Sequence, residues 1–320
     1  MNTSAAAQSF AALSDGIADV VERTGASVVG LQARRSWPSS GVILEPGVVV
    51  TAAHVLRRED GIAAVLPDGS AASATLVGVD ASTDVAVLRL DLAQAAGASQ
   101  TLAAPVVATN FADAASVRPG HFVVAVARAT DGSLSASAGV VARTGGEWRT
   151  WRGGHVDRRV QLDGGLWPGF SGGPVVDARG AIIGIGTTAL SRGRAVVIPV
   201  SVLKRVTEQL LTRGRVSHGY IGAAVQTVEL PATLRSRLGL ANTHGLIVVS
   251  TVPNGPADAA GITLGDTLLT LGDKALAEVD DLKAALAGHR IGDRVTLSLL
   301  RGGQLATVDA TVGERPHEHS

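Results

Sequence analysis

The sequence predicts a mainly β protein in which two small antiparallel barrels are followed by a smaller α+β domain. Its 320 residues are more than one domain usually holds and are enough for two. Short runs rich in valine and isoleucine recur about every 8–12 residues between glycines and prolines, a pattern typical of a sandwich or a closed barrel. This pattern ends near Pro199, where a helix and then a differently patterned unit begin.

Composition excludes several classes of protein. The 28 basic residues balance the 28 acidic residues, so no net charge attracts the chain to nucleic acid or to an anionic membrane. The absence of cysteine excludes disulfides, thiolate metal sites and a cysteine nucleophile. No apolar run approaches the ~18 residues of a membrane helix. We therefore expect no nucleic-acid partner, no membrane span, no metal and no cofactor.

The first domain is expected over residues 14–213, after an alanine- and serine-rich segment, residues 1–13, that we expect to be flexible. Apolar residues at helical spacing predict a short helix over Ser14–Arg23 and a second helix over Val202–Leu211, capped by Ser201. The strands expected between the two helices are Val28–Leu31, Gly41–Leu44, Val48–Val50, Thr75–Val79, Val85–Leu90, Phe122–Val126, Gly139–Ala142, Arg159–Leu162, Val175–Val176, Ile182–Ile185 and Val196–Ile198.

The second domain is expected over residues 220–313, after a short polar linker at 214–219. One helix is predicted within it, over Val279–Ala287. The polar tail, residues 314–320, is expected to be disordered. The strands expected in this domain are Gly245–Ser250, Thr267–Leu271, Arg294–Leu300 and Ala306–Val312.

The stretch Pro168–Pro174 holds Ser171 between glycines, with a proline at each end. Glycines let a backbone turn tightly and approach a ligand closely. The serine hydroxyl is then presented at the apex of a turn, beside backbone N–H groups. That arrangement suits a nucleophile next to an oxyanion hole, whose donors we expect to be the N–H groups of Gly169 and Ser171.

A base and an orienting acid for this serine occur earlier in the chain. His54 follows a hydrophobic strand, and Asp84 opens another. The chain order His, Asp, Ser is one of three known orders for the same catalytic geometry. Each residue alone has an ordinary structural explanation. Together, the three motifs predict an acyl-transfer site with Ser171 as nucleophile, His54 as base and Asp84 as the group that orients the imidazole.

A second chemical interpretation of the turn is weaker. Gly169–Gly173 also fits G-x-S-x-G, the nucleophile elbow of α/β-hydrolases, which requires a helix directly after the serine. Here Gly172–Asp177 and the glycine turn after it predict a hairpin, and no strand–helix alternation surrounds them. We therefore do not expect an elbow.

The chain resembles the HtrA (DegP-like) family of serine proteases over roughly Ile17–Val312. The resemblance implies a two-barrel, trypsin-like (chymotrypsin) fold followed by one α+β PDZ domain. It also implies endoproteolysis of unfolded or damaged proteins, often from a homotrimer. The motifs that carry the resemblance are Thr51–Val55, Gly78–Leu88, Arg118–Ala125, Phe170–Asp177, Val197–Val200, Gly219–Gly222 and Gly255–Asp266.

The location follows from the resemblance rather than from a targeting signal. The family resemblance implies a periplasmic or other extracytoplasmic compartment. The N-terminus has no basic residue before Arg23 and no long apolar core, so the sequence as given shows no secretory signal and would suit the cytoplasm if complete.

Substrate preference is expected from the same turn. In trypsin-like folds the base of the specificity pocket lies about six residues before the nucleophile, which gives Gly165 with Leu166 beside it. Neither residue is acidic, so a basic substrate side chain would be buried there without a partner. We expect cleavage after small or medium aliphatic residues.

The segment Gly219–Gly222 resembles the carboxylate-binding loop of a PDZ domain. A peptide C-terminus would add a strand to the sheet edge while N–H groups of the loop bind its carboxylate. We expect Tyr220, Ile221 and Gly222 to form this loop, and Leu282 and Leu286 to line the opposite wall. A purely structural role in the core is the alternative for these side chains.

Bulky residues beside the serine keep a second function open. Phe170 stands where the family usually has asparagine, and Trp167 is larger than expected. Both would narrow a substrate cleft at the turn. The alternative function is a proteolytically weak or inactive chaperone or scaffold that binds clients through the PDZ groove. A further open question is whether Trp148–His155 forms a solvated loop or an activation loop.

Overall fold

The computed structural model describes residues 3–33, 38–56, 61–92, 110–191, 193–214, 216, 219–286, 289 and 291–314. The chain folds into two compact units, Met1–Val216 and Ser217–Ser320. The division falls within residues 214–219, which the sequence predicts as a linker.

The first barrel is a closed antiparallel sheet with the strand order β1-β2-β3-β6-β5-β4. Its strands are rich in β-branched residues, which pack well on a pleated sheet. Every residue of β3 is buried. The sequence did not predict β4, whose two central alanines have little preference for a strand. The strands are β1 (Val28–Gln32), β2 (Ser39–Glu45), β3 (Val48–Ala52), β4 (Ile62–Val65), β5 (Ala71–Asp80) and β6 (Val85–Asp91).

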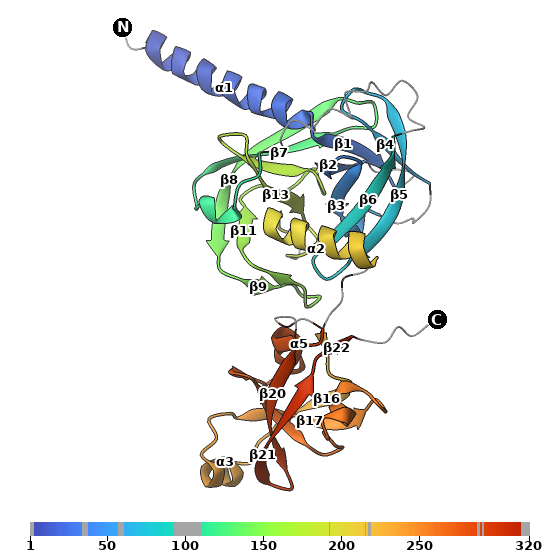
Figure 1. The fold of residues 1–320 in the computed structure, drawn as a ribbon. Coiled ribbons are helices and arrows are strands. Elements are labelled where there is room, and N and C mark those ends of the chain that lie inside the picture. The colour runs from blue at the N-terminus through green and yellow to red at the C-terminus, as the bar shows by residue number, and fades with distance from the viewer. Residues whose placement is uncertain are drawn as a thin grey trace. The chain divides into compact units, whose positions relative to one another are not determined.

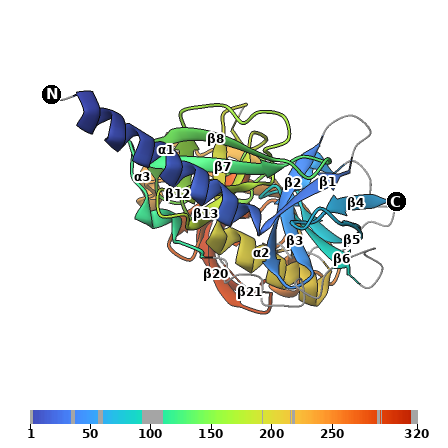
Figure 2. The same ribbon diagram turned by 90° about the horizontal axis from the view of Figure 1, so that it is seen from above.

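The second barrel closes in the order β11-β14-β13-β12-β7-β8. Figures 1 and 2 show the two barrels side by side in the first unit, with blue and cyan strands in one and green and yellow strands in the other. Two closed barrels confirm the predicted fold class. The strands are β7 (Phe122–Arg128), β8 (Leu134–Gly145), β11 (Arg159–Leu162), β12 (Pro174–Asp177), β13 (Ile182–Thr187) and β14 (Val196–Pro199).

Helix α2 (Val200–Arg213) packs on both barrels, contacting β5 and β6 of the first and β13 and β14 of the second. It follows Pro199 directly and ends at Gly214, whose left-handed φ of 67° closes the last turn with a hydrogen bond to Leu210 O. Its buried face is apolar at helical spacing, and each buried leucine or valine contributes about 1.5–3 kcal/mol. The helix therefore helps to fix one barrel against the other.

Helix α1 (Thr3–Gly25) begins eleven residues earlier than the helix predicted over Ser14–Arg23. The alanines before Ser14 have high helix propensity, so the helix extends through them although residues 7–13 are exposed. In Figure 1 its N-terminal turns extend away from the barrels. Its C-terminal part packs against β1, β7 and β8.

The second unit is built on an antiparallel sheet with the strand order β16-β17-β18-β20-β21, and the short β19 (Lys274–Ala275) pairs with β18. Two short strands, β15 (Gly219–Tyr220) and β22 (Gly313–Glu314), form a separate pair. Of the tail predicted at 314–320, only Glu314 lies within the described residues. The main strands and helices are β16 (Ala223–Glu229), α3 (Ala232–Leu238), β17 (His244–Thr251), α4 (Pro256–Ala259), β18 (Thr267–Leu271), α5 (Val279–Leu286), β20 (Arg294–Arg301) and β21 (Gln304–Thr311).

Candidate active site

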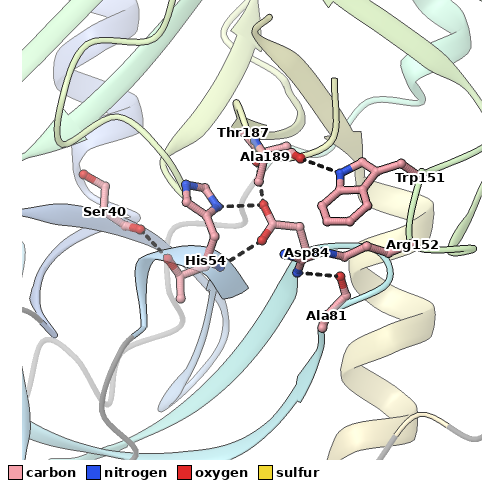
Figure 3. A network of polar contacts seen from close by, with 9 residues as sticks. Ser40, His54, Ala81, Asp84, Trp151, Arg152, Thr187 and Ala189 are labelled. Atoms are coloured by element: carbon pink, nitrogen blue, oxygen red, sulfur yellow. Dashed lines mark hydrogen bonds and ion pairs between the residues drawn. The ribbon is translucent and has the colours of Figure 1, made fainter. Parts of the chain in front are cut away.

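His54 lies in a short 3₁₀ turn, Ala53–Val55, that directly follows β3. The turn is bound to the segment before β6 at three points. Ala53 N donates to Asp84 O at 2.9 Å, and His54 N donates to Asp84 Oδ1 at 2.8 Å. His54 Nδ1 lies 2.8 Å from Asp84 Oδ2, and Figure 3 marks this contact with a dashed line. The backbone and the ring of the histidine are therefore both positioned by one aspartate.

Asp84 is fully buried, and its carboxylate accepts three hydrogen bonds. Besides the two bonds from His54, Thr187 Oγ1 donates to Asp84 Oδ2 at 2.5 Å. A buried carboxylate is costly unless such donors satisfy it. The backbone of Asp84 has a φ of 60°, which aspartate tolerates better than most residues. This strained conformation is maintained by the hydrogen bonds around it.

Thr187 is a site residue that the sequence analysis missed. It ends the apolar strand β13, and both its side chain and its backbone are buried. Its hydroxyl oxygen also accepts a hydrogen bond from Ala189 N at 3.1 Å. The sequence signal for Thr187 was its hydroxyl at the end of the otherwise apolar run Ile182–Thr187.

The turn that contains Ser171 is bonded to both barrels. Gly172 N donates to Gly186 O at 2.9 Å, and Ser40 N donates to Ser171 O at 3.4 Å. Gly172 has a φ of 85°, and a Cβ at this position would overlap Ser40 O and Thr51 Oγ1. The glycine after the serine is therefore required both by conformation and by the close approach of the first barrel.

A pocket of about 230 Å³ brings most of the predicted catalytic residues together. His54, Ser171, Gly169 and Leu166 all line it, whereas Gly165 is exposed and lies outside its lining. The remaining lining residues are Pro38, Ser39, Val55, Trp167, Pro168 and Thr188.

The predicted nucleophile and the predicted oxyanion donors make no hydrogen bonds with the described residues. Ser171 Oγ makes no hydrogen bond there, and the N–H groups of Gly169 and Ser171 donate none. Hydrogen bonds between a nucleophile and its base are often long without substrate and shorten when substrate binds. The two N–H groups are free to receive a ligand oxygen.

The two bulky residues of the turn differ in environment. Phe170 is 6% exposed and packs in the core of the second barrel with Val123, Val175 and Ile183. It does not line the pocket. Trp167 is 70% exposed and does line the pocket. The expectation that Phe170 narrows the cleft is therefore wrong, because its side chain points into the barrel, and Trp167 alone stands at the cleft.

A hairpin packs over the segment that carries Asp84. It is formed by β9 (Trp148–Arg149) and β10 (His155–Val156). Thr150 Oγ1 donates to Ser82 O at 2.6 Å, and Trp151 Nε1 donates to Ala189 O at 2.9 Å. Figure 3 shows the Trp151 indole beside Ala189, with Asp84 and Thr187 next to it. The stretch Trp148–His155 is thus a hairpin that bonds to the segments around Asp84 and Thr187, while Trp151 and Arg152 at its tip are exposed.

In the second unit, the three apolar residues predicted for peptide binding are buried together. Ile221, Leu282 and Leu286 are 2–5% exposed and belong to one core cluster. Gly222 has a φ of 75°, and Tyr220 pairs with Gly313. The N–H groups of Ile221 and Gly222 donate no hydrogen bond to any described residue.

No group of three or more histidine, aspartate or glutamate side chains in the described ranges could hold a metal ion. Among the same residues, no helix is long and apolar enough to cross a membrane.

Comparison with known proteins relates both units to described families. Residues 39–185 match the family model of a trypsin-like peptidase domain, and residues 219–312 match that of a PDZ domain. The chain is 33% identical over 285 residues to the probable periplasmic serine endoprotease DegP-like of Brucella suis biovar 1 (strain 1330). That alignment covers 88% of this chain and 53% of the relative, so the chain spans about half the length of the curated relatives that it matches.

Two solved structures are similar over nearly the whole chain. The HtrA-type protease AlgW with a decapeptide is 27% identical with a TM-score of 0.70, and the match covers 94% of this chain and 99% of AlgW. A substituted AlgW with a tripeptide is 30% identical with a TM-score of 0.69, covering 93% and 97% respectively.

Proposed function

The chain belongs to the HtrA (DegP-like) family of serine proteases with a trypsin-like peptidase domain and one PDZ domain, and from this we propose that it is an endopeptidase using Ser171, His54 and Asp84. The observation that carries the proposal is the buried Asp84 carboxylate bonded to His54 Nδ1 at 2.8 Å, with His54 and Ser171 lining one pocket.

The proposed chemistry assigns one role to each group. Because Asp84 accepts from Nδ1, it favours the tautomer in which the other ring nitrogen, Nε2, carries the lone pair that takes the proton of Ser171 Oγ. The alkoxide then attacks the peptide carbonyl carbon, and the N–H groups of Gly169 and Ser171 stabilise the oxyanion. Each such donor contributes roughly 2.7–4 kcal/mol in comparable enzymes. His54 next protonates the leaving amine, and water hydrolyses the acyl-enzyme.

The direct test uses casein digestion and labelling by a fluorophosphonate probe. We expect the wild-type chain to digest casein and to be labelled, and Ser171→Ala to lose both properties. Ser135→Ala, an exposed serine on β8, is the matched control and should behave as wild type. Equal casein digestion by Ser171→Ala and wild type would refute the assignment of the nucleophile.

We propose that the substrates are unfolded polypeptides cleaved after small or medium aliphatic residues. Leu166 lines the pocket, and no acidic side chain is among its lining residues. A lysine or arginine side chain would therefore be desolvated there without a counter-charge. A peptide-library profile should show valine, alanine or leucine before the scissile bond, and a profile dominated by arginine or lysine would overturn this preference.

We propose that the second unit binds hydrophobic peptide C-termini next to Tyr220, Ile221 and Gly222. The unused N–H groups of Ile221 and Gly222 support this, because a carboxylate needs such donors. Leu282 and Leu286 are core residues and would support the wall of the groove. Fluorescence anisotropy should show binding of a peptide ending in free valine, and loss of binding when the same peptide is amidated. Equal binding of both peptides would exclude carboxylate recognition.

The family also suggests an assembly and a location for this chain. We propose a homotrimer, tested by sedimentation equilibrium, for which a monomeric mass would be the contradicting result. The names of the curated relatives support a periplasmic location.

The competing function is a proteolytically weak or inactive chaperone, which Phe170 and Trp167 were expected to favour by narrowing the cleft. Because Phe170 is buried, only Trp167 still supports that function.

A further inference from the structure

Ser40 binds the proposed catalytic turn at two carbonyl groups. It lies in β2, is fully buried, and belongs to the first barrel, whereas the turn leads into β12 of the second. Ser40 Oγ donates to Gly169 O at 2.8 Å, and Ser40 N donates to Ser171 O at 3.4 Å. One residue of the first barrel therefore holds the peptide unit that precedes Phe170 and the peptide unit that follows Ser171.

Gly169 has a φ of 98°, a conformation that glycine adopts readily, and it has no Cβ to restrict its backbone angles. Two hydrogen bonds hold the peptide unit between Gly169 and Phe170: Ser40 Oγ donates to Gly169 O, and Phe170 N donates to Trp167 O at 3.1 Å. Within the described residues, the hydrogen bond from Ser40 Oγ is the one hydrogen bond that Gly169 makes.

The hydroxyl of Ser40 is itself oriented by the second barrel. Arg128 N donates to Ser40 Oγ at 3.1 Å, which occupies a lone pair of that oxygen and leaves its proton for Gly169 O. The Arg128 side chain is buried and donates to Gly25 O, Val28 O and Gly132 O at 2.6–2.8 Å. The donor to Ser40 is thus fixed at a junction of α1, β1 and the β7–β8 loop.

We propose that Ser40 is a positioning residue whose hydroxyl holds Gly169 in the conformation that presents the oxyanion donors to the pocket. This proposal rests on the proposed function. Without the hydroxyl, Gly169 would sample other conformations, and only a fraction of molecules would present both N–H groups. Transition-state stabilisation would then fall while binding of the ground-state peptide would not.

The test compares Ser40→Ala, Ser40→Cys and wild type on a peptide substrate. We expect kcat to fall about 10- to 100-fold in Ser40→Ala, with KM changed less than about twofold. Ser40→Cys keeps a weak donor and should be intermediate. The affinity for a peptide boronate, which forms a tetrahedral adduct with Ser171, should fall in parallel with kcat/KM. Ser27→Ala, at a buried serine whose described hydrogen bonds are made by its backbone, is the control and should match wild type.

The outcomes separate this proposal from the proposed function. Wild-type kcat and boronate affinity in a folded Ser40→Ala protein would overturn the positioning role while leaving the protease assignment intact. Changes in melting temperature without any change in kcat would show a structural role only and would also overturn it. If Ser40→Ala does not fold, the comparison of Ser40→Cys with wild type decides by the same criteria. A wild-type chain that neither cleaves peptide nor reacts with a fluorophosphonate would refute the proposed function, and this inference with it.

Discussion

At the scale of single residues, the proposed site depends on the hydrogen bonds that the buried Asp84 carboxylate accepts. Its two oxygens accept from the backbone N–H of His54, from Nδ1 of His54 and from the Thr187 hydroxyl. The imidazole cannot rotate without leaving a buried carboxylate oxygen short of a donor. The histidine orientation is therefore determined before any substrate binds.

Replacing Asp84 by asparagine should lower kcat by about 10⁴. The amide group would offer a donor where His54 Nδ1 now donates, and the imidazole would adopt the wrong tautomer. Steady-state kinetics on a peptide substrate measures the change. Asp157→Asn, at an exposed position, is the control and should keep full activity. An Asp84→Asn enzyme within tenfold of wild type would contradict the proposed role.

Phe170 and Trp167 should respond in opposite ways to substitution by alanine. Phe170→Ala removes a buried ring and should lower the free energy of unfolding by about 3–5 kcal/mol. Trp167→Ala should change that free energy by less than about 0.5 kcal/mol and should alter KM, because its ring lines the pocket. Urea denaturation and peptide kinetics give the two readouts. A stable Phe170→Ala protein with a widened substrate range would show that the phenylalanine, not the tryptophan, limits the cleft.

At the scale of elements, the decisive feature is the close approach of the proposed catalytic turn, Pro168–Pro174, to β2 and β3. Gly172 N bonds to β13, while Ser40 O and Thr51 Oγ1 occupy the space where a side chain would stand. The β9–β10 hairpin approaches the segment of Asp84 just as closely, since a Cβ on Gly154 would overlap Ser82 O. Backbone-to-backbone packing thus sets the positions of the nucleophile and the acid.

Gly172→Ala should abolish fluorophosphonate labelling and lower the melting temperature strongly. Gly120→Ala is a matched control, because Gly120 also has a positive φ, 89°, yet has open space around it. Gly120→Ala should lower the free energy of unfolding only by the cost of the left-handed backbone, about 1–2 kcal/mol, and should keep its labelling. Similar melting temperatures for the two variants would show that the turn can move away from the first barrel.

At the scale of the whole molecule, the second unit has its own core and its own ion pair, between the buried Asp266 and the exposed Arg301. Asp266 is 2% exposed and accepts from Arg301 Nη2 at 2.7 Å. Burial opposes the ionisation of this carboxyl, but the hydrogen bonds from Arg301 and Thr263 outweigh it and lower its pKa. The second unit therefore gains stability from the ionised pair only where Asp266 is charged.

The second unit should lose stability as the pH falls below about 4, the pKa of an unfolded aspartate. Because the folded pKa is the lower one, this stabilisation is fully present above that value and disappears as the folded carboxyl is protonated. Asp266→Asn should flatten the dependence of the melting temperature on pH between 3 and 6. Calorimetry measures the melting temperature of each unit as a function of pH. All the tryptophans lie before residue 217, so their fluorescence identifies the transition of the first unit. Lys283→Gln, in an exposed pair with Asp280, should leave the slope unchanged.

Sequence patterns predicted the barrels, which the structure confirms, and the proposed site residues, of which His54 and Ser171 line one pocket, because both predictions use local signals. β-branched runs form strands, and a serine among glycines indicates an exposed nucleophile. Thr187 was not predicted, because its role depends on the packing of β13 against the segment of Asp84. The direction of the Phe170 side chain was also not predictable, since a turn can point it either into the barrel or into the cleft. The early start of α1 was missed because alanine favours helix without leaving an apolar pattern.

The distribution of the site between the two barrels has a consequence for heat inactivation. His54 and Asp84 belong to one barrel and Ser171 to the other, and Ser40 bonds across the boundary. A slip of about an ångström along that boundary would separate the proposed nucleophile from its base while the strand pairing within each barrel stayed intact. Catalysis should therefore be the first property lost on warming, at temperatures where neither barrel has begun to melt.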